Sequence, residues 1–497
     1  MAHHVPMEAF PAWAHFTRVQ FTGVKLQDVG HGKGLGLVVA AESGLEGRAV
    51  EEQKEAVLRV PRDVVLSAEA VDEYAKVDHN FKQLLDVAGQ KFGDAARGTN
   101  LAQSTRGNIL LYLVSHLAQG RSPAGLTTTP WTQYMRFLPR PVPVPTMWSF
   151  GERRLLHGTS LETALKAKLA TLQSEFEMLH DLSEDLPFWN TLFWVDETIS
   201  LQDWLLVDAW YRSRCLELPG LGTAMVPALD MVNHSSQPFS LYEVDENEDV
   251  VLVVRPEVDI SEGEEMTISY GAAKSASEML FNYGFVDPTN AGSAMTLPLH
   301  PFPDDPLAKA KVHIFHGAKT LHLSLKADKE AGGEDKEEGI RRCTWHSPFV
   351  YLMCLNEEDG LSFQLLQDTE GGRNLRLFWQ DQDVTERADD FEALIRGHKL
   401  YQVFRLRAVT VVLQTVEEQL GSIRTGQCDA ELELLQIAGE LRPDCIAAAK
   451  ALKDAEEQLL AEAWEALGHE RDALLTDEDV VAYLGSTEGF DTEADFS

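Results

Sequence analysis

The sequence predicts an α+β protein that continues into an all-helical region, and three observations support this prediction. Residues 16–66 and 250–271 have the alternation and the β-branched composition that are typical of short strands. Between them, apolar side chains recur at helical spacing from about residue 70 to 214. From about 387 to 475 the helical spacing returns. Strands that enclose helices and are followed by further helices indicate an α+β part joined to an all-α domain.

The first half of the chain shows its elements in a clear order. Residues 16–26 alternate as a strand does, a glycine-rich turn follows at 30–36, and 35–40 are apolar and partly β-branched. Residues 70–120 contain apolar helical runs, whereas the next distinct segment, 137–147, reads FLPRPVPVPTM. Proline at this density excludes both regular elements, so we expect an extended connection there.

Two helices, the first of them amphipathic, and two strands follow this connection. The first helix is indicated by apolar residues three and four positions apart: Leu161, Leu165, Leu169, Leu172, Phe176 and Leu179. The second spans about 200–214 with Ser200 as its cap, and the strands lie at 250–255 and 265–271. Residues 327–340 are polar and of low complexity, so we expect a mobile loop there.

Composition restricts the class of partner. The chain has 497 residues, with 43 Lys and Arg against 79 Asp and Glu, for a net charge of −36. Such a surface repels nucleic-acid phosphates and anionic lipid and attracts a basic protein, although the same charge can serve solubility alone. No apolar stretch approaches membrane-spanning length, and the first 16 residues lack the order of a signal peptide. We therefore expect a cytoplasmic protein, or one also found in the nucleus, with neither a nucleic-acid nor a membrane partner.

The cysteines do not indicate a metal centre or a disulfide framework. They are five in number, scattered, and without a CxxC pair: Cys215, Cys343, Cys354, Cys428 and Cys445. Reduced thiols that pack as small apolar side chains are the simpler interpretation. We expect no metal.

A first candidate site is the glycine-rich turn Gly30-His31-Gly32-Lys33-Gly34-Leu35-Gly36. Glycines let a ligand approach the backbone closely, but a purely structural turn has the same composition. The segment from Asp28 also resembles the acidic-x-Gly-x-Gly-x-Gly loop of Rossmann-type methyltransferases. That loop must open a helix, whereas the residues after Leu35 favour a strand. The Rossmann alternative is therefore disfavoured.

Two further motifs follow in the chain. Asp230-Met231-Val232-Asn233-His234 comes after an apolar stretch, and its Asn and Asp side chains can hold a tight turn. Ile268-Ser269-Tyr270-Gly271 ends a strand, and a short helix beginning near Ser275 carries Tyr283-Gly284-Phe285. Each motif alone is compatible with an Asx turn or with ordinary core packing.

Taken together, the three motifs resemble the SET-domain protein methyltransferases. The resemblance is nearest to the Rubisco large-subunit methyltransferase-like subgroup, which includes ribosomal-protein lysine and actin-histidine methyltransferases. It is dense over residues 30–40 and 204–287, and the thirteen residues between Tyr270 and Tyr283 match that subgroup. The fold that it implies is a SET-domain β-fold with an inserted helical subdomain, followed by an all-α C-terminal substrate-binding domain.

The resemblance also implies roles for individual residues. The cofactor, S-adenosylmethionine, would be bound by ten of them: Lys33, Gly34, Leu35, Gly36, Arg214, Asp230, Asn233, His234, Tyr283 and Phe285. Tyr283 and Phe285 would line the acceptor pocket as well. Arg214 would meet the cofactor carboxylate, although Arg212 stands two residues away and is an alternative. Tyr270 matches the catalytic tyrosine, which aligns the methyl group for attack.

The resemblance predicts a domain plan and an activity. The plan is a SET catalytic domain over 1–290 with helices inserted at about 70–198, a helical substrate-binding domain over 291–486, and a disordered acidic tail over 487–497. The activity is protein-lysine N-methylation of a basic, non-histone target such as a ribosomal or translation protein, because the cysteine-rich zinc segment of many histone-directed enzymes is missing. Protein-histidine N-methylation and a catalytically silent binding module remain the alternatives.

Overall fold

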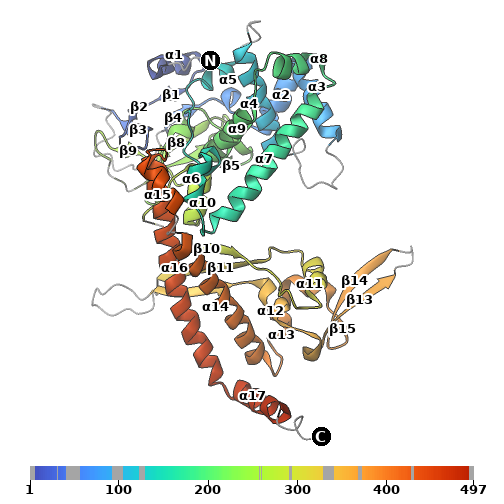
Figure 1. Ribbon diagram of the computed structural model, residues 1–497. Coiled ribbons are helices and arrows are strands. Elements are labelled where there is room, and N and C mark those ends of the chain that lie inside the picture. Colours follow the sequence, from blue (N-terminus) through green and yellow to red (C-terminus); the bar gives the residue numbers. More distant parts are fainter. Residues whose placement is uncertain are drawn as a thin grey trace. The chain divides into compact units, whose positions relative to one another are not determined.

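The computed structural model describes residues 6–30, 32–40, 56–91, 104–122, 129–256, 258, 260–289, 294–327, 341–367, 372–426 and 430–491. The chain forms two compact units (Figure 1). Unit 1 comprises Met1–Ser149, Thr163–Ala272 and Met279–Phe285. Unit 2 comprises Phe150–Glu162, Ala273–Glu278 and Val286–Ser497. The units therefore do not follow a single cut in the sequence, because two short segments within the first 290 residues pack with unit 2.

The strands of unit 1 form small antiparallel sheets. One has the order β1-β4-β8-β7 and another β2-β3-β9, while β5 and β6 form a hairpin. Their bounds are Gln20–Phe21 (β1), Val24–Asp28 (β2), Leu35–Val39 (β3), Ala56–Val60 (β4), Cys215–Leu218 (β5), Gly222–Met225 (β6), Ser240–Val244 (β7), Val250–Val254 (β8) and Glu265–Met266 (β9). Strands within 16–66 and 250–271 are confirmed, but residues 16–26 contain β1 and the start of β2 rather than one strand, and β9 is shorter than predicted.

Helices make up the rest of unit 1. They are Phe10–Phe16 (α1), Ala68–Val77 (α2), His79–Lys91 (α3), Thr105–Arg121 (α4), Pro130–Tyr134 (α5), Leu161–Ser183 (α7), Pro187–Asn190 (α8), Leu201–Arg214 (α9) and the end of Ala276–Tyr283 (α10). The predicted proline-rich connection has no long element, only the 3-10 turn Pro145–Met147. α9 begins after Ser200, as predicted, and its N-cap backbone NH donates to the Asp203 carboxylate at 2.9 Å.

The core of unit 1 lies where α4 and α9 pack together. Residues Ile109–Gln119 of α4 are buried on every side. On α9 the buried side chains include Trp204, Val207 and Trp210. A helix that is buried on all sides belongs in the interior of a domain, and burial of a large apolar side chain stabilises the fold by about 1.5–3 kcal/mol. α9 is therefore a rigid support for whatever its C-terminal end carries.

Unit 2 combines helices with two three-stranded antiparallel sheets, β10-β11-β12 and β13-β14-β15. The strands are Ala294–Pro298, Thr320–Ala327, Arg341–His346, Leu361–Gln367, Arg373–Trp379 and Gln382–Asp383. The helices are Phe150–Arg154 (α6), Ala308–Ile314 (α11), Pro348–Cys354 (α12), Phe391–Ile395 (α13), Tyr401–Gly426 (α14), Ala430–Ile437 (α15), Pro443–Leu475 (α16) and Glu478–Asp491 (α17). The long helices α14 and α16 lie side by side (Figure 1).

These strands correct one part of the predicted fold. The mixed α+β class is confirmed, but the prediction that 291–486 is all-helical is wrong, because strands occupy much of 294–383. The physical signal was present in Thr320–Ala327, where the buried Leu321 and Leu323 flank the exposed His322. This alternation was overlooked because the polar segment 327–340 follows it directly. Residues 328–340, the greater part of the predicted mobile loop, lie outside the described residues.

The predicted disordered tail is also partly wrong. Its first residues, 487–491, form the end of helix α17, and residues 492–497 lie outside the described residues. Of the five cysteines, four are free thiols and Cys428 is not among the described residues. None of the helices in the described ranges combines the length and the apolar character that a membrane span requires.

Candidate active site

The glycine-rich segment forms the turn between the antiparallel strands β2 and β3. Gly30, Gly32 and Gly34 have φ of +71°, +76° and +75°, which side chains with a Cβ rarely adopt. The backbone NH of Val29 donates to Gly34 O at 2.9 Å and closes the turn. The chain leaves the turn as a strand, so the Rossmann-type alternative, which requires a helix there, is excluded. His31 lies outside the described residues.

Gly36 marks a close approach between this turn and two other segments. A Cβ at Gly36 would lie 2.6 Å from Glu265 Oε1 and 3.1 Å from Asn233 Nδ2. Asn233 Nδ2 donates to Leu35 O at 3.1 Å and to Glu265 Oε1 at 2.6 Å. Lys33 Nζ lies 3.4 Å from Glu265 Oε2. Glu265 therefore joins Lys33 to Asn233.

The Asn233-His234 segment pairs with the strand that leads to Tyr270. Ile268 NH donates to Asn233 O, and Ser235 NH donates to Ile268 O, both at 3.0 Å. This is a parallel bridge between segments that are far apart in the sequence. It brings Asn233, His234 and Tyr270 into one place, as their predicted shared role requires.

Tyr270 is held at both ends. Its backbone NH donates to His234 Nδ1 at 3.0 Å, so the proton of the neutral imidazole lies on Nε2. Its hydroxyl donates to Val232 O at 2.8 Å. Burial raises the pKa of Tyr270 well above the ordinary value of 10.0, against the opposing charge of Arg214. The hydroxyl is therefore neutral at physiological pH, and its oxygen keeps lone pairs that can accept weak CH···O contacts.

Tyr270, Tyr283, Phe285 and the imidazole of His234 form one aromatic group. The ring centroids of Tyr270 and Tyr283 are 4.5 Å apart, and Phe285 lies 6.4 Å from each. The imidazole of His234 lies 5.2 Å from Tyr270 and 6.0 Å from Phe285. Tyr283 hydroxyl also lies 3.4 Å from Tyr270 O. Aromatic faces attract cations, so this group suits a positively charged ligand.

A buried polar cluster lies beside the aromatic group. Asp230 has no exposed side-chain surface, and its carboxylate receives Arg214 Nη1 at 3.2 Å and the hydroxyl of Tyr134. Burial raises the pKa of Asp230, whereas the Arg214 charge and the Tyr134 hydrogen bond act to lower it. Ala228, whose NH donates to the Tyr134 hydroxyl at 3.0 Å, has a φ of +69°. Strain of this kind at a non-glycine residue is typical of functional sites.

The two arginines that the sequence left as alternatives are used differently. Every nitrogen of the Arg212 guanidinium is engaged: Nε with Asp208, Nη1 with Phe281 O and Nη2 with Thr146 Oγ1. Arg214 uses Nη1 for Asp230, while its buried Nε finds no partner among the described residues. A buried donor without a partner costs about 1–3 kcal/mol, so Arg214 is the arginine that an anionic ligand can satisfy.

All ten predicted binding residues and Tyr270 lie in the described part of unit 1. Hydrogen bonds and ring contacts link Asn233, His234, Tyr270, Tyr283 and Phe285. Asn233 also bonds to Leu35 O directly and to Lys33 through Glu265, and Gly36 packs closely against both Asn233 and Glu265. The sequence reasoning missed Glu265 and Tyr134. Glu265 could have been found from its place in the strand that leads to Tyr270. For Tyr134, 96 residues from Asp230, no sequence signal was available. Within the described ranges, no group of three or more His, Cys, Asp or Glu could hold a metal.

Comparisons with known proteins bear on this geometry. No protein-family model matches the chain. It is 24% identical over 366 residues to SET domain-containing protein 8 of Schizosaccharomyces pombe, an alignment that covers 74% of this chain and 77% of the relative. It is 26% identical over 182 residues to the chloroplast Rubisco large-subunit N-methyltransferase of Nicotiana tabacum, covering 34% of this chain and 35% of that protein.

Solved structures extend the likeness to nearly the whole chain. The SET domain of LSMT, the Rubisco large-subunit methyltransferase, bound to lysine and AdoHcy superposes with a TM-score of 0.61 and 18% identity, covering 95% of this chain and 93% of that one. Rubisco LSMT bound to AdoMet gives the same TM-score over 94% and 92%.

The chain has the SET-domain fold of the Rubisco large-subunit methyltransferases. The SET-domain fold expected from the three motifs is confirmed. In this fold the parallel bridge joins His234 to Ile268, and the glycine turn lies against Asn233 and Glu265 at Gly36.

Proposed function

We propose that this SET-domain protein is an S-adenosylmethionine-dependent protein-lysine N-methyltransferase that acts on a non-histone protein. The observation that carries the proposal is the neutral hydroxyl of Tyr270, held by Val232 O within the aromatic group and next to the Arg214–Asp230 pair. This arrangement places a cation-binding surface beside a donor for a carboxylate. S-adenosylmethionine carries a sulfonium cation and a carboxylate, so it matches both.

The residues present fit this cofactor. The unpartnered Nε of Arg214 suits its carboxylate. At Gly32 and Gly34 a Cβ would meet nothing within 4 Å, so the backbone of the glycine turn is open to a ligand there. Lys33, Gly34, Leu35, Asn233 and His234 would hold the remainder. When bound, the cofactor supplies an electrophilic methyl group on a sulfonium cation.

The way in which the acceptor lysine reacts follows from the protonation states of its amine and of Tyr270. A lysine titrates near 10.4 in water and must lose its proton before it can attack. Removal of the amine from water and the adjacent sulfonium charge would both disfavour the charged amine and thereby lower its pKa. Tyr270 cannot serve as the base, because burial raises its pKa and keeps it protonated. Its proposed role is alignment of the reacting groups, and the proton leaves the amine to solvent before attack.

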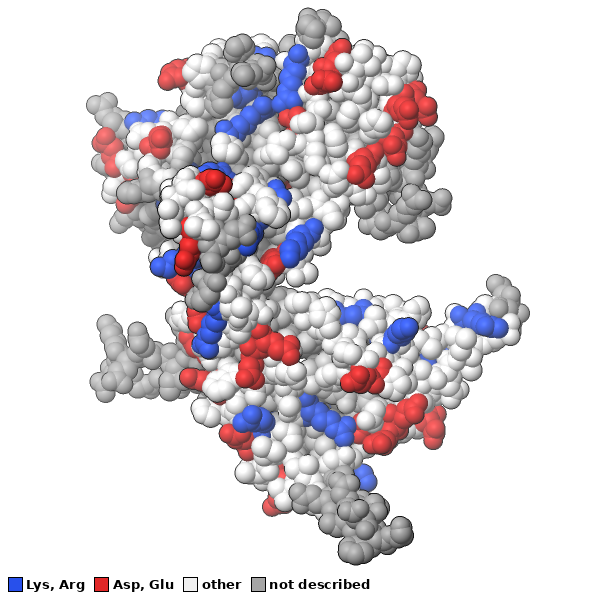
Figure 2. Space-filling model, viewed as in Figure 1, with Lys and Arg blue, Asp and Glu red and all other residues white. Residues whose placement is uncertain are grey.

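The substrate class is inferred from charge and from relatives. The net charge of −36 favours a basic protein, and Figure 2 shows the acidic side chains of the visible face in several small groups rather than one patch. A relative in Arabidopsis thaliana, 24% identical over 58% of this chain and 53% of its own length, is named for lysine methylation of fructose-bisphosphate aldolase. By analogy we assign substrate binding to residues 291–486, and we infer a cytoplasmic enzyme, also present in the nucleus, that modifies a ribosomal or translation protein.

The test is a methyl-transfer assay with labelled S-adenosylmethionine and a cell extract enriched in basic proteins. We expect label on a lysine, located by mass spectrometry. Tyr270→Phe should reduce transfer roughly 10²-fold, because the methyl group loses its alignment. Tyr242→Phe is the matched control: this tyrosine lies in the same unit, its hydroxyl donates to Glu217 O at 3.4 Å, and its loss should leave transfer unchanged.

The outcomes separate the alternatives. Label on a histidine would retain the fold but replace the acceptor. A protein that binds neither S-adenosylmethionine nor its product by calorimetry would be a silent binding module. Equal transfer by wild type and Tyr270→Phe would remove Tyr270 from the mechanism.

A further inference from the structure

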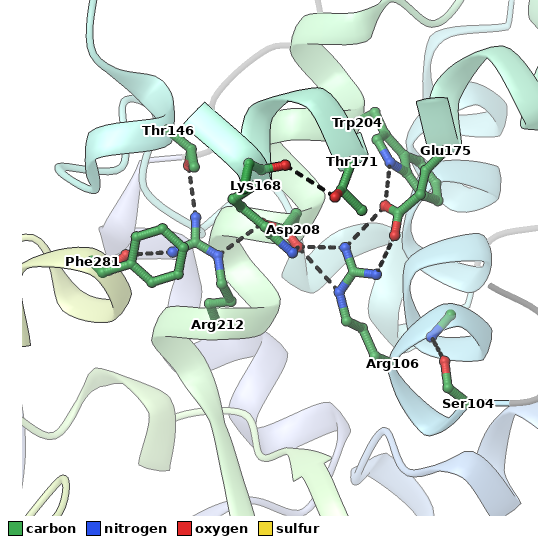
Figure 3. A network of polar contacts seen from close by, with 12 residues as sticks. Ser104, Arg106, Thr146, Lys168, Thr171, Glu175, Trp204, Asp208, Arg212 and Phe281 are labelled. Atoms are coloured by element: carbon green, nitrogen blue, oxygen red, sulfur yellow. Dashed lines mark hydrogen bonds and ion pairs between the residues drawn. The ribbon is translucent and has the colours of Figure 1, made fainter. Parts of the chain in front are cut away.

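A network of charges crosses the helical part of unit 1 (Figure 3). At its centre the fully buried carboxylate of Asp208 on α9 meets three cations: Arg106 Nη2 at 2.6 Å, Lys168 Nζ at 2.9 Å and Arg212 Nε at 2.8 Å. Burial acts to raise the pKa of Asp208, but the three positive charges lower it to about 2. Asp208 therefore stays ionised and holds all three partners.

Arg212 differs from Arg106 and Lys168 in the groups that it contacts besides Asp208. Arg106 extends to Glu175 on α7, at 2.7 Å, and so ties helix to helix. The Arg212 fork instead donates to the carbonyl oxygen of Phe281 on α10 and, at 2.6 Å, to Thr146 Oγ1. Its guanidinium also stacks 4.5 Å from the Phe281 ring centroid. Arg212 thus links α9 to the end of α10 (Figure 3).

The end of α10 is the part that carries the aromatic group. Tyr283 is its last residue, and Phe285 follows one residue beyond it. Gly284, with φ of +86°, lies so close to Pro143 that a Cβ would be 2.7 Å from the proline carbonyl carbon. Pro143 is fixed in turn by Trp148 Nε1, which donates to its oxygen at 2.8 Å. Residues 279–285 are therefore held at Phe281 by Arg212 and at Gly284 by Pro143.

We propose that Arg212 is a positioning residue for the acceptor side of the active site. It holds the carbonyl of Phe281, two residues before Tyr283, and thereby sets the places of Tyr283 and Phe285 against Tyr270. This inference rests on the proposed methyltransferase function, and it assigns separate roles to two arginines of one helix. Residues two apart on a helix do not share a face, so Arg212 serves the aromatic group while Arg214 serves the cofactor carboxylate.

The test compares Arg212→Lys with Arg106→Lys and Arg214→Lys in the full chain. Lysine retains the charge that Asp208 requires but cannot reproduce the planar fork toward Phe281 and Thr146. Arg106→Lys is the matched control, because it replaces a partly buried partner of the same carboxylate that does not touch α10. Three quantities are measured: the dissociation constant of S-adenosylmethionine by calorimetry, kcat for methyl transfer, and hydrogen exchange of residues 279–285.

We expect Arg212→Lys to leave the dissociation constant within about twofold, to lower kcat about tenfold, and to accelerate exchange in 279–285. Arg106→Lys should lower Tm without changing kcat or the exchange of that segment. Arg214→Lys should instead weaken cofactor binding about tenfold or more. The separate roles of Arg212 and Arg214 would be overturned if Arg212→Lys and Arg214→Lys weakened cofactor binding equally. They would also be overturned if Arg212→Lys and Arg106→Lys lowered kcat equally.

The exchange measurement separates this inference from the proposed function. If the wild type transfers no methyl group, faster exchange in 279–285 that is confined to Arg212→Lys still supports the positioning role, while the function fails. If exchange there is the same in all variants, Arg212 does not hold the segment, whatever the activity.

Discussion

At the scale of single residues, the site depends on side chains that keep one hydrogen-bond donor or acceptor free for a ligand. Tyr270 donates its hydroxyl proton to Val232 O and keeps its oxygen as an acceptor. Arg214 binds Asp230 through Nη1 and leaves Nε for a ligand. The sequence indicated both residues through their motifs. It could not rank Arg214 above Arg212, because the distinction depends on which acceptors the fold brings to each guanidinium.

Gly36 offers a prediction at this scale. In Gly36→Ala the new Cβ displaces Glu265, which is hydrogen-bonded to Asn233, so we expect S-adenosylmethionine to bind about tenfold more weakly or worse. Calorimetry measures the change. Gly32→Ala is the control: its Cβ would meet nothing within 4 Å, and only the strain of a φ of +76° applies. If both variants bind alike, the close approach at Gly36 has no role in binding.

At the scale of elements, one helix carries both arginines and is anchored by its neighbours. α9 packs against α4, and the chain enters α4 through Ser104, whose Oγ accepts the NH of Gly107 at 3.0 Å. Apolar runs within 70–120 and the Ser200 cap predicted these two helices, because both signals are local. The strands of unit 2 were missed, because short alternating segments between polar residues give a weaker signal than long helices do.

The α4 cap gives a prediction for this scale. Ser104→Ala removes the acceptor for Gly107 NH, and we expect a loss of about 1 kcal/mol in the free energy of unfolding of unit 1. Urea unfolding followed by tryptophan fluorescence measures it. Ser104→Asp, which retains an oxygen at the cap, should unfold at nearly the wild-type midpoint. A loss of the same size in both variants would indicate that the cap hydrogen bond does not stabilise the helix.

At the scale of the whole molecule, each unit contains buried ionisable groups that the active site does not use. In unit 2, Glu456 of α16 receives Ser160 NH at 3.0 Å and also the Ser160 hydroxyl. Burial raises the pKa of Glu456 from 4.5 to about 7, although both hydrogen bonds act to lower it. The folded state therefore binds a proton more tightly here than the unfolded chain does.

This shift predicts how the stability of unit 2 depends on pH. Because the folded pKa lies above the unfolded one, the contribution of Glu456 favours folding at low pH and is lost as pH rises from about 4.5 through 7, by about 3 kcal/mol at most. Hydrogen exchange of α16, followed across this pH range after correction for intrinsic rates, measures the change. Glu456→Gln should lose this contribution, and a pH profile identical to that of the wild type would contradict the assignment.

The sequence by itself determined the α+β class, the order of the helices in the first half, and the three motifs that resemble a SET domain. These properties are local: periodicity, glycine-rich turns and short motifs can be recognised without knowing what they contact. Only the tertiary structure decided that Glu265 joins Lys33 to Asn233, that Tyr134 binds Asp230, and that Arg212 reaches Phe281. These contacts join residues 32 to 232 positions apart, and no local pattern encodes which distant backbone or carboxylate will meet a given side chain.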